Sequence, residues 1–262
     1  MTEENTQGIV LKLIDYKDAN KLASIFTFHH GITTAKFTGI KKEKAKLKAV
    51  AQPFVLADFT FSKTRSNKTV TGANMIDNFY QILANYNKTI CGYIVLDVVK
   101  TLLPENQPEQ DLFLITVASL KNIETQNEYV ATIDFLLKFL NFSGVGIEVP
   151  ETDYVFLDKS TGDFTTTRNL YSVEIDKKVY STLKLVANNP DLCLSIKVGN
   201  KVRNDSQYHP ASELQNLSNN AIKNVEILPE TITENTLKQA IRLLGNIIYI
   251  RFNSEIKTIH FI

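Results

Sequence analysis

Residues 22–40 read Leu-Ala-Ser-Ile-Phe-Thr-Phe-His-His-Gly-Ile-Thr-Thr-Ala-Lys-Phe-Thr-Gly-Ile, and this stretch is the clearest sign of how the chain folds. Two runs rich in Ile, Phe and Thr flank the dipeptide His30-Gly31. β-Branched and aromatic residues on either side of a glycine-bearing turn are typical of paired strands. The stretch therefore predicts strands at residues 22–28 and 32–40.

Strand patterns continue on both sides of this hairpin. An apolar, β-branched run covers residues 8–14, and aromatic residues recur along residues 50–62 after Pro53. Residues 68–79 form a further candidate strand. Short strands separated by turns, all within the first 80 residues, suit a five-stranded Greek-key barrel such as the OB-fold. We therefore expect residues 1–80 to be an OB-fold nucleic-acid-binding domain.

From about residue 80 the apolar residues no longer alternate, and their spacing favours helices. The sequence predicts an α+β chain in which residues 81–262 are a helical domain with an irregular or hairpin insert at 150–170. The last clear helix begins at Thr233, with Thr236 as an alternative cap. The other expected helices are residues 82–103 ending at Pro104, a segment from Pro108 to about 123, 129–142 ending near Gly144, 173–186 and 212–223, whereas 188–210 is ambiguous, with a possible strand at 192–198.

Positive charge is concentrated at one place in a nearly neutral chain. Residues 36–48 contain six lysines against one acid, Glu43. Residues 1–80 hold 12 Lys/Arg and 7 Asp/Glu, a balance of +5, and the remaining 17 and 21 leave −4 in residues 81–262. A basic segment after the third expected strand is a candidate seat for a phosphate backbone, and the acidic half is the candidate for protein docking.

The candidate nucleic-acid-binding residues follow from this charge and from nearby aromatic rings, because a basic groove with stacking rings binds single strands. A solvated, functionless charged surface is the alternative interpretation. Residues 41–50 are expected to be a short lysine-rich helix or a loop, and Phe37 is the ring expected to face a base. The candidates are Lys36, Phe37, Lys41, Lys42, Lys44, Lys46, Lys48, Lys63, Arg65 and Lys68.

The sequence offers little that would support catalysis. Neither a Gly-x4-Gly-Lys-Ser/Thr nor a Gly-x-Gly-x-x-Gly motif occurs, and the four histidines lack metal-ligand spacing. Two cysteines, Cys91 and Cys193, are too few for a disulfide framework. No apolar run is long enough for a membrane helix, and the acidic N-terminus does not begin a signal peptide. We expect a cytoplasmic protein that is not an enzyme and has no cofactor or metal.

Over roughly residues 8–60 the order of short motifs resembles the RecO family of bacterial recombination mediators. The motifs are Gly8-Ile-Val-Leu11, Asp15-Tyr16-x-Asp18-Ala-Asn20-Lys21, Ile25-Phe26-Thr27-x-x-x-Gly31, Lys36-x-x-Gly39-Ile-Lys41-Lys42-x-Lys44-x-Lys46-Leu47 and Gln52-Pro53-Phe54. The family typically has Gly-Ala-Arg-Arg-Pro-Lys-Ser-Arg-Leu where this chain has residues 39–47, so lysines replace arginines here. Beyond residue 60 the resemblance is thinner and includes Arg242-Leu-Leu244 and Ile256-Lys257-Thr258.

The resemblance implies a protein that binds single- and double-stranded DNA and anneals complementary strands. It also implies partners: RecR, the C-terminal tail of single-stranded DNA-binding protein and, indirectly, RecA. Many members carry four zinc-binding cysteines after the position of Gly144, and this chain has none there. We therefore expect a zinc-less insert held by packing alone. The alternative interpretation is a general OB-fold module that binds RNA or organises a complex.

Overall fold

The computed structural model describes residues 2–63, 68–152, 155–189 and 232–262. The chain divides into two compact units. Unit 1 comprises residues 1–85 and 96–117, and unit 2 comprises residues 86–95 and 118–262. The expected helix at 212–223 and nearly all of the ambiguous segment 188–210 lie outside the described residues, as does Arg65. The domain boundary near residue 80 stays a prediction.

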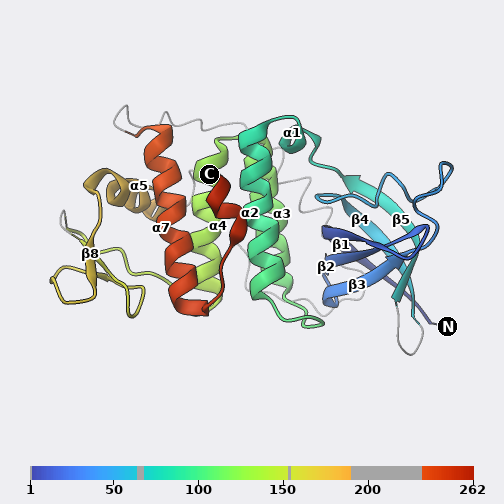
Figure 1. Ribbon diagram of the computed structural model, residues 1–262, viewed down its shortest axis with the longest axis horizontal. Helices are drawn as coiled ribbons and strands as arrows, with labels where there is room; N and C mark the ends of the chain where they lie inside the picture. Colours follow the sequence, from blue (N-terminus) through green and yellow to red (C-terminus); the bar gives the residue numbers. More distant parts are fainter. Residues whose placement is uncertain (1, 64–67, 153–154, 190–231) are drawn as a thin grey trace. The chain divides into compact units, whose positions relative to one another are not determined.

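Unit 1 contains a closed barrel of five strands in the order β1-β2-β3-β5-β4 (Figure 1). The strands are antiparallel to their neighbours except for the short parallel contact between β3 and β5, which closes the barrel. This confirms the expected OB-fold. The bounds are β1 Thr2–Tyr16, β2 Asn20–Thr27, β3 Gly31–Phe37, β4 Leu56–Lys63 and β5 Lys68–Asp77.

Aromatic rings fill the barrel interior. The ring of Phe59 lies between Phe37, at 6.4 Å edge-to-face, and Phe61, at 5.9 Å in a stacked arrangement. All three rings are fully buried, together with Ile25 and Ala35 from the facing strands. Burying a large side chain of this kind contributes about 1.5–3 kcal/mol, so these residues make the barrel a real hydrophobic core.

The fourth strand begins later than the sequence indicates. β4 starts at Leu56, and residues 50–55 form turns rather than the expected first half of a strand. Pro53 has no N–H group to donate to a strand ladder, and Phe54 adopts a left-handed conformation with φ of 70°. The amide of Phe54 instead donates to the Val10 carbonyl at 3.0 Å. This hydrogen bond attaches the turn at residues 50–55 to strand β1 of the barrel.

The outer surface of the β2–β3 hairpin packs against helical residues of the same unit. Phe113 contacts the rings of Phe26 and Phe28 edge-to-face at 5.5 and 5.7 Å. The amide of Asn106 donates to the Ile32 carbonyl at 2.9 Å. Phe113 belongs to α3, Gln110–Thr125, and Asn106 to the loop that joins α3 to α2, Tyr86–Leu102. The short helix α1 spans Tyr80–Leu83.

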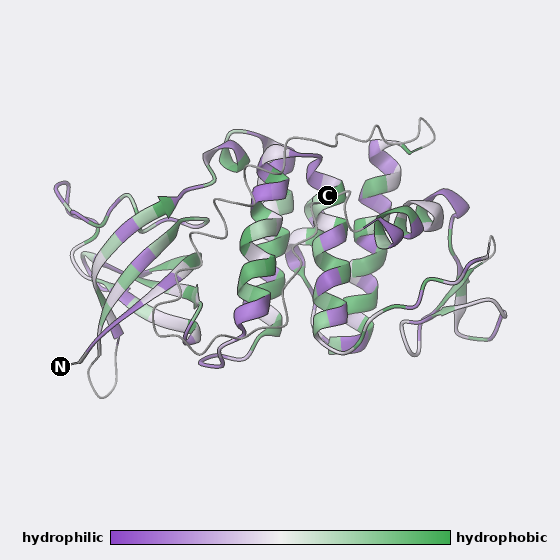
Figure 2. Cartoon of the chain, turned by 180° about the vertical axis from the view of Figure 1, so that it is seen from behind, coloured by the Kyte–Doolittle hydropathy of each residue, from purple (hydrophilic) through white to green (hydrophobic). Residues whose placement is uncertain are grey.

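The helices of unit 2 begin at polar caps that the sequence displays. Asn127, Asp176 and Thr233 each accept from backbone amides at the start of a helix. The last helix is capped by Thr233, the first of the two caps that the sequence suggests, and not by the alternative, Thr236. Figure 2 shows hydrophobic and hydrophilic residues alternating along the long helices. The elements are α4 Glu128–Phe142, α5 Lys177–Asn188, α7 Glu234–Phe252 and the 3-10 helix η1 Lys257–Phe261.

The insert after α4 is a small three-stranded sheet in the order β7-β6-β8. Its strands are β6 Phe156–Asp158, β7 Phe164–Thr165 and β8 Ser172–Glu174. The expected helix at 173–186 is therefore wrong at its start, because Asp176 accepts from Lys178 N and Val179 N and α5 begins only after it. In the parts of the chain that are described, no helix combines the length and apolarity needed to cross a membrane.

Two glycines with similar backbone angles provide a matched test of the barrel's packing on its helical neighbour. Gly31 has φ of 66°, and a Cβ there would lie 1.9 Å from the Gln107 carbonyl oxygen. Gly144 has φ of 72° and no neighbouring atom within 4 Å of the same position. We expect Gly31→Ala to lower the free energy of unfolding by about 3 kcal/mol or more, because strain and a steric clash add.

Gly144→Ala is the control, with an expected loss of about 1 kcal/mol from strain alone. Urea-induced unfolding of both variants, followed by circular dichroism, measures the difference. Equal losses for the two variants would show that the contact between Gly31 and Gln107 does not constrain the fold.

Candidate nucleic-acid interface

Residues 38–51, here called the basic loop, form successive turns rather than a helix. Amides of Lys42, Ala45 and Lys48 donate to carbonyls three residues earlier, at 3.1 to 3.2 Å. Of the two forms expected from the sequence, the structure therefore shows the loop. A chain of such turns is compact, so its charges stay close together.

The basic loop is amphipathic. Ile40, Val50 and Ala51 are buried and belong to the barrel core, and Ala45 and Leu47 pack against it half-buried. The lysines between these apolar residues point toward solvent, because the apolar side chains occupy the side of the loop that faces the barrel core. The exposed lysines are Lys41, Lys42, Lys44, Lys46 and Lys48.

The loop is tied to the turn between β1 and β2. The amide of Gly39 donates to Asn20 Oδ1 at 2.8 Å, and the amide of Lys41 donates to the Ala19 carbonyl at 3.1 Å. Lys41 Nζ also lies 2.9 Å from Asp15 Oδ2. These contacts give a structural reason for two of the sequence motifs, because Asp15 and Asn20 from one meet Gly39 and Lys41 from the other in space.

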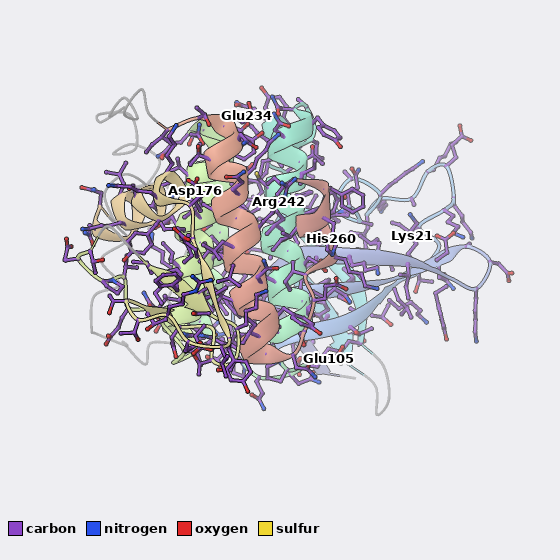
Figure 3. All side chains as sticks on the ribbon, turned by 60° about the vertical axis from the view of Figure 1, so that its left-hand side comes forward. Lys21, Glu105, Asp176, Glu234, Arg242 and His260 are labelled. Atoms are coloured by element: carbon purple, nitrogen blue, oxygen red, sulfur yellow. The ribbon has the colours of Figure 1, made fainter. Side chains whose placement is uncertain are left out.

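Asp15 also changes the charge that the loop presents. Its hydrogen bond with Lys41 holds the pKa of the Asp15 carboxyl below its usual value, and the charges of Lys41 and Lys21 act in the same direction. Lys21 is labelled on the barrel in Figure 3. Lys41 is thus partly neutralised. Within the described part of the chain, Lys42, Lys44, Lys46 and Lys48 have no ion-pair partner and keep their full charge for another anion.

The remaining predicted lysines lie in different settings. Lys36 is half-buried on β3, and Lys63 ends β4 with a side chain that lies outside the described atoms. Lys68 begins β5, where its ammonium lies 3.3 Å from a Glu4 carboxylate oxygen and 5.8 Å from the centre of the Phe61 ring. Its side chain is only 14% exposed, so Lys68 is less accessible than the lysines of the basic loop.

The expectation that Phe37 faces a base conflicts with the structure. Its ring has no exposed surface and packs edge-to-face against Phe59 inside the barrel. Phe37 lies opposite Lys21 in the β2–β3 pair, and the strand's alternation directs it inward. A ring enclosed in the core cannot stack on a nucleotide, so Phe37 is a core residue.

The structure adds an outer face on β1–β3 that the sequence reasoning missed. Cross-strand register places Lys12, Ser24 and Thr34 in one row and Ile14, Leu22 and Lys36 in the next. Lys12 and Ile14 are exposed. The face of strands 2 and 3 is where OB-folds commonly bind oligonucleotides. A lysine at each side of an apolar and hydroxyl-bearing surface suits a nucleic-acid strand.

The signal for this face was hidden by a β-bulge. The register of β1 against β2 shifts between Val10 and Lys12, so the inward and outward positions exchange along β1. Simple alternation through the bulge assigns Lys12 and Ile14 to the wrong side.

The described ranges also contain no group of three or more His, Cys, Asp or Glu side chains placed to hold a metal.

Asn20 is the residue whose removal tests how the basic loop is held. We expect Asn20→Ala to lower the free energy of unfolding by about 1 kcal/mol, because the Gly39 amide loses its acceptor. Exchange of the Gly39 amide with deuterium, read by NMR, is expected to become several-fold faster. Asn74→Ala, at an exposed position of β5, is the control. An unchanged Gly39 exchange rate would mean that Asn20 does not anchor the loop.

Comparison with known proteins assigns the chain to a family. The family model described as Recombination protein O N terminal matches residues 1–79, and the model for the C terminal of the same protein matches residues 83–152. Together the two models cover more than half of the chain. Both match described parts of the structure, the first containing the barrel and the basic loop.

Several curated relatives named DNA repair protein RecO are similar to this chain. The relative from Clostridium novyi is 25% identical over 214 residues, covering 76% of this chain and 83% of the relative. The relative from Caldicellulosiruptor saccharolyticus is 29% identical over 140 residues, 53% of this chain and 57% of the relative. That from Bacillus subtilis is 31% identical over 140 residues, 53% of this chain and 55% of the relative.

The chain thus spans little more than half the length of the relatives from Caldicellulosiruptor saccharolyticus and Bacillus subtilis. The two family models extend through the barrel and into the helices, over residues 1–79 and 83–152. With a barrel in the strand order of an OB-fold, a basic loop fixed to it and both family models in sequence, this chain belongs to the RecO family.

Proposed function

We propose that this chain is a DNA repair protein and recombination mediator that binds single- and double-stranded DNA and anneals complementary strands. The observation that carries the proposal is the basic loop, whose lysines are held outward by buried apolar anchors on an OB-fold barrel. The relatives' name, DNA repair protein RecO, supports the same function.

The proposed mechanism is electrostatic. Lys42, Lys44, Lys46 and Lys48 neutralise phosphates, and the outer face of β1–β3 supports the strand beside them. Two complementary strands held near one cationic surface repel each other less, which favours annealing. Lysine ammonium groups bind as point charges without the bidentate geometry of arginine, so we expect weak sequence preference. No bond is broken, so the protein acts without catalysis or a cofactor.

The proposed partners follow from the family. RecR and the C-terminal tail of single-stranded DNA-binding protein bind this chain, which with RecR helps RecA load onto coated DNA. The acidic balance of residues 81–262 makes that half the proposed protein-docking part. The proposed location is the cytoplasm, in association with the nucleoid.

The salt dependence of DNA binding tests the role of the basic loop. If about five single-strand phosphates are contacted, log affinity falls with log salt at a slope of about −3.5. We expect Lys42→Glu, Lys44→Glu and Lys46→Glu together to reduce the steepness of that slope by about 2, because about three contacts are lost. Fluorescence anisotropy of a labelled single strand at several salt concentrations gives the slope. Lys41 is left unchanged because it pairs with Asp15.

The matched control makes the same change of charge on unit 2. Lys159, Lys178 and Lys257 are exposed there, and their replacement by glutamate alters the net charge equally. The control is expected to keep the wild-type slope. If both triple variants bind DNA as the wild type does, the basic loop is not the site; if both lose affinity equally, only net charge matters.

The rival function is an OB-fold module that binds RNA or organises a complex. The exposed lysines would serve RNA binding as well as DNA binding, because ammonium groups do not distinguish ribose from deoxyribose. Strand-annealing assays with matched DNA and RNA, with and without single-stranded DNA-binding protein, separate the two. The recombination role predicts annealing of DNA coated by that protein, and the rival predicts annealing of bare RNA only.

A further inference from the structure

The insert between α4 and α5 lacks the residues that the zinc-bearing relatives use. Residues 144–176 contain neither cysteine nor histidine, the ligands that structural zinc sites require. The carboxylates in its described part do not gather as metal ligands either. The residues present therefore do not fit a zinc site, and the short strands of the insert need another cross-link.

Arg251 lies where the turns of the insert converge. It comes from the last turn of α7, more than 80 residues away in sequence from its acceptors. Nη1 donates to the carbonyls of Val145 and, at 3.0 Å, Gly146. Nη2 donates to the Gly162 carbonyl at 3.2 Å and to Asp163 Oδ1. One side chain thus joins the segment after α4, the turn between β6 and β7, and α7.

The surroundings of the guanidinium make these contacts strong. The Arg251 side chain is only 9% exposed, and hydrogen bonds from a charged donor exceed neutral ones in strength. A planar guanidinium presents its donors in a fixed fork, which a lysine cannot reproduce. Removing it would leave several carbonyls without their donor, so the cost would extend beyond one ion pair.

The turn that receives Arg251 is shaped to fit it. Gly162 has φ of 77°, and a Cβ at that position would lie 3.1 Å from Arg251 Nε. The adjoining strand is fixed by a second polar centre: Asp158 accepts from the Ser160 amide at 2.8 Å and from Asn169 Nδ2 at 2.7 Å. Hydrogen bonds from Ser160 and then Asn169 hold the pKa of Asp158 below its ordinary value.

We propose that Arg251 is the organising cross-link of the insert, so that one buried guanidinium performs the structural task that thiolates and a metal ion perform in zinc-bearing relatives. This corrects the expectation that packing alone holds the insert. The insert of this chain is therefore insensitive to chelators and sensitive to loss of a single arginine.

Hydrogen–deuterium exchange of the full chain tests the proposal. In Arg251→Met, we expect amides of residues 158–163 to exchange about tenfold faster or more, because charged hydrogen bonds are lost. Arg251→Lys is expected to recover only part of the protection. The control is Arg242→Met, since Arg242 is an exposed arginine on the same helix, labelled in Figure 3. Its exchange pattern should match the wild type.

Two further measurements keep the proposal testable if Arg251→Met does not fold. Asp163→Asn removes one charge while keeping an acceptor, and it should speed exchange at residues 158–163 without unfolding α7. Treating the wild-type chain with a zinc chelator should leave exchange and melting temperature unchanged. Stoichiometric zinc in the purified chain, a chelator-induced loss of protection, or wild-type exchange in both the Arg251 and Asp163 variants would each overturn the proposal.

Discussion

The pairing of β1 with two strands at once is the constraint on which the barrel depends. Residues 8 and 9 pair with β2 on one side and with β4 on the other, whereas residues 12–16 pair with β2 alone. The bulge between Val10 and Lys12 separates the part of β1 that pairs on both sides from the part that pairs with β2 alone. At this point Val10 exchanges hydrogen bonds of 3.0 Å with Phe54 N and Val55 O, which fixes the turn that follows the basic loop. A shift in this strand would disturb core, loop and outer face together.

The basic loop shows how a fold can hold like charges close together. Lysines with few acidic neighbours repel one another, so an unanchored segment would spread them apart. Here the apolar residues Ile40, Val50 and Ala51 are buried in the barrel core, and Asn20 accepts from Gly39 at the other end of the loop. Burial of the anchors offsets the repulsion, and the resulting positive surface is available to a phosphate chain.

In unit 2, polar side chains rather than apolar anchors hold an irregular segment in place. Its insert has strands of only two or three residues, too short to be stable by themselves. Polar side chains at defined points compensate: Arg251 joins the turns, and Asp158 fixes the strand. Both units thus rely on a few contacts between residues far apart in the chain to hold irregular segments.

Local periodicity, composition and capping chemistry were enough to predict a five-stranded barrel followed by helices, the position of the basic segment and the cap of the last helix, but not the turns at residues 50–55 or the strand at residues 172–174. It predicted Thr233 as a cap and lysines near a barrel strand. The burial of Phe37, the shared face of Lys12, Ile14 and Lys36, and the link from Arg251 to distant turns become apparent only in the folded chain. Those properties depend on a bulge and on pairings between distant residues, which local pattern does not encode.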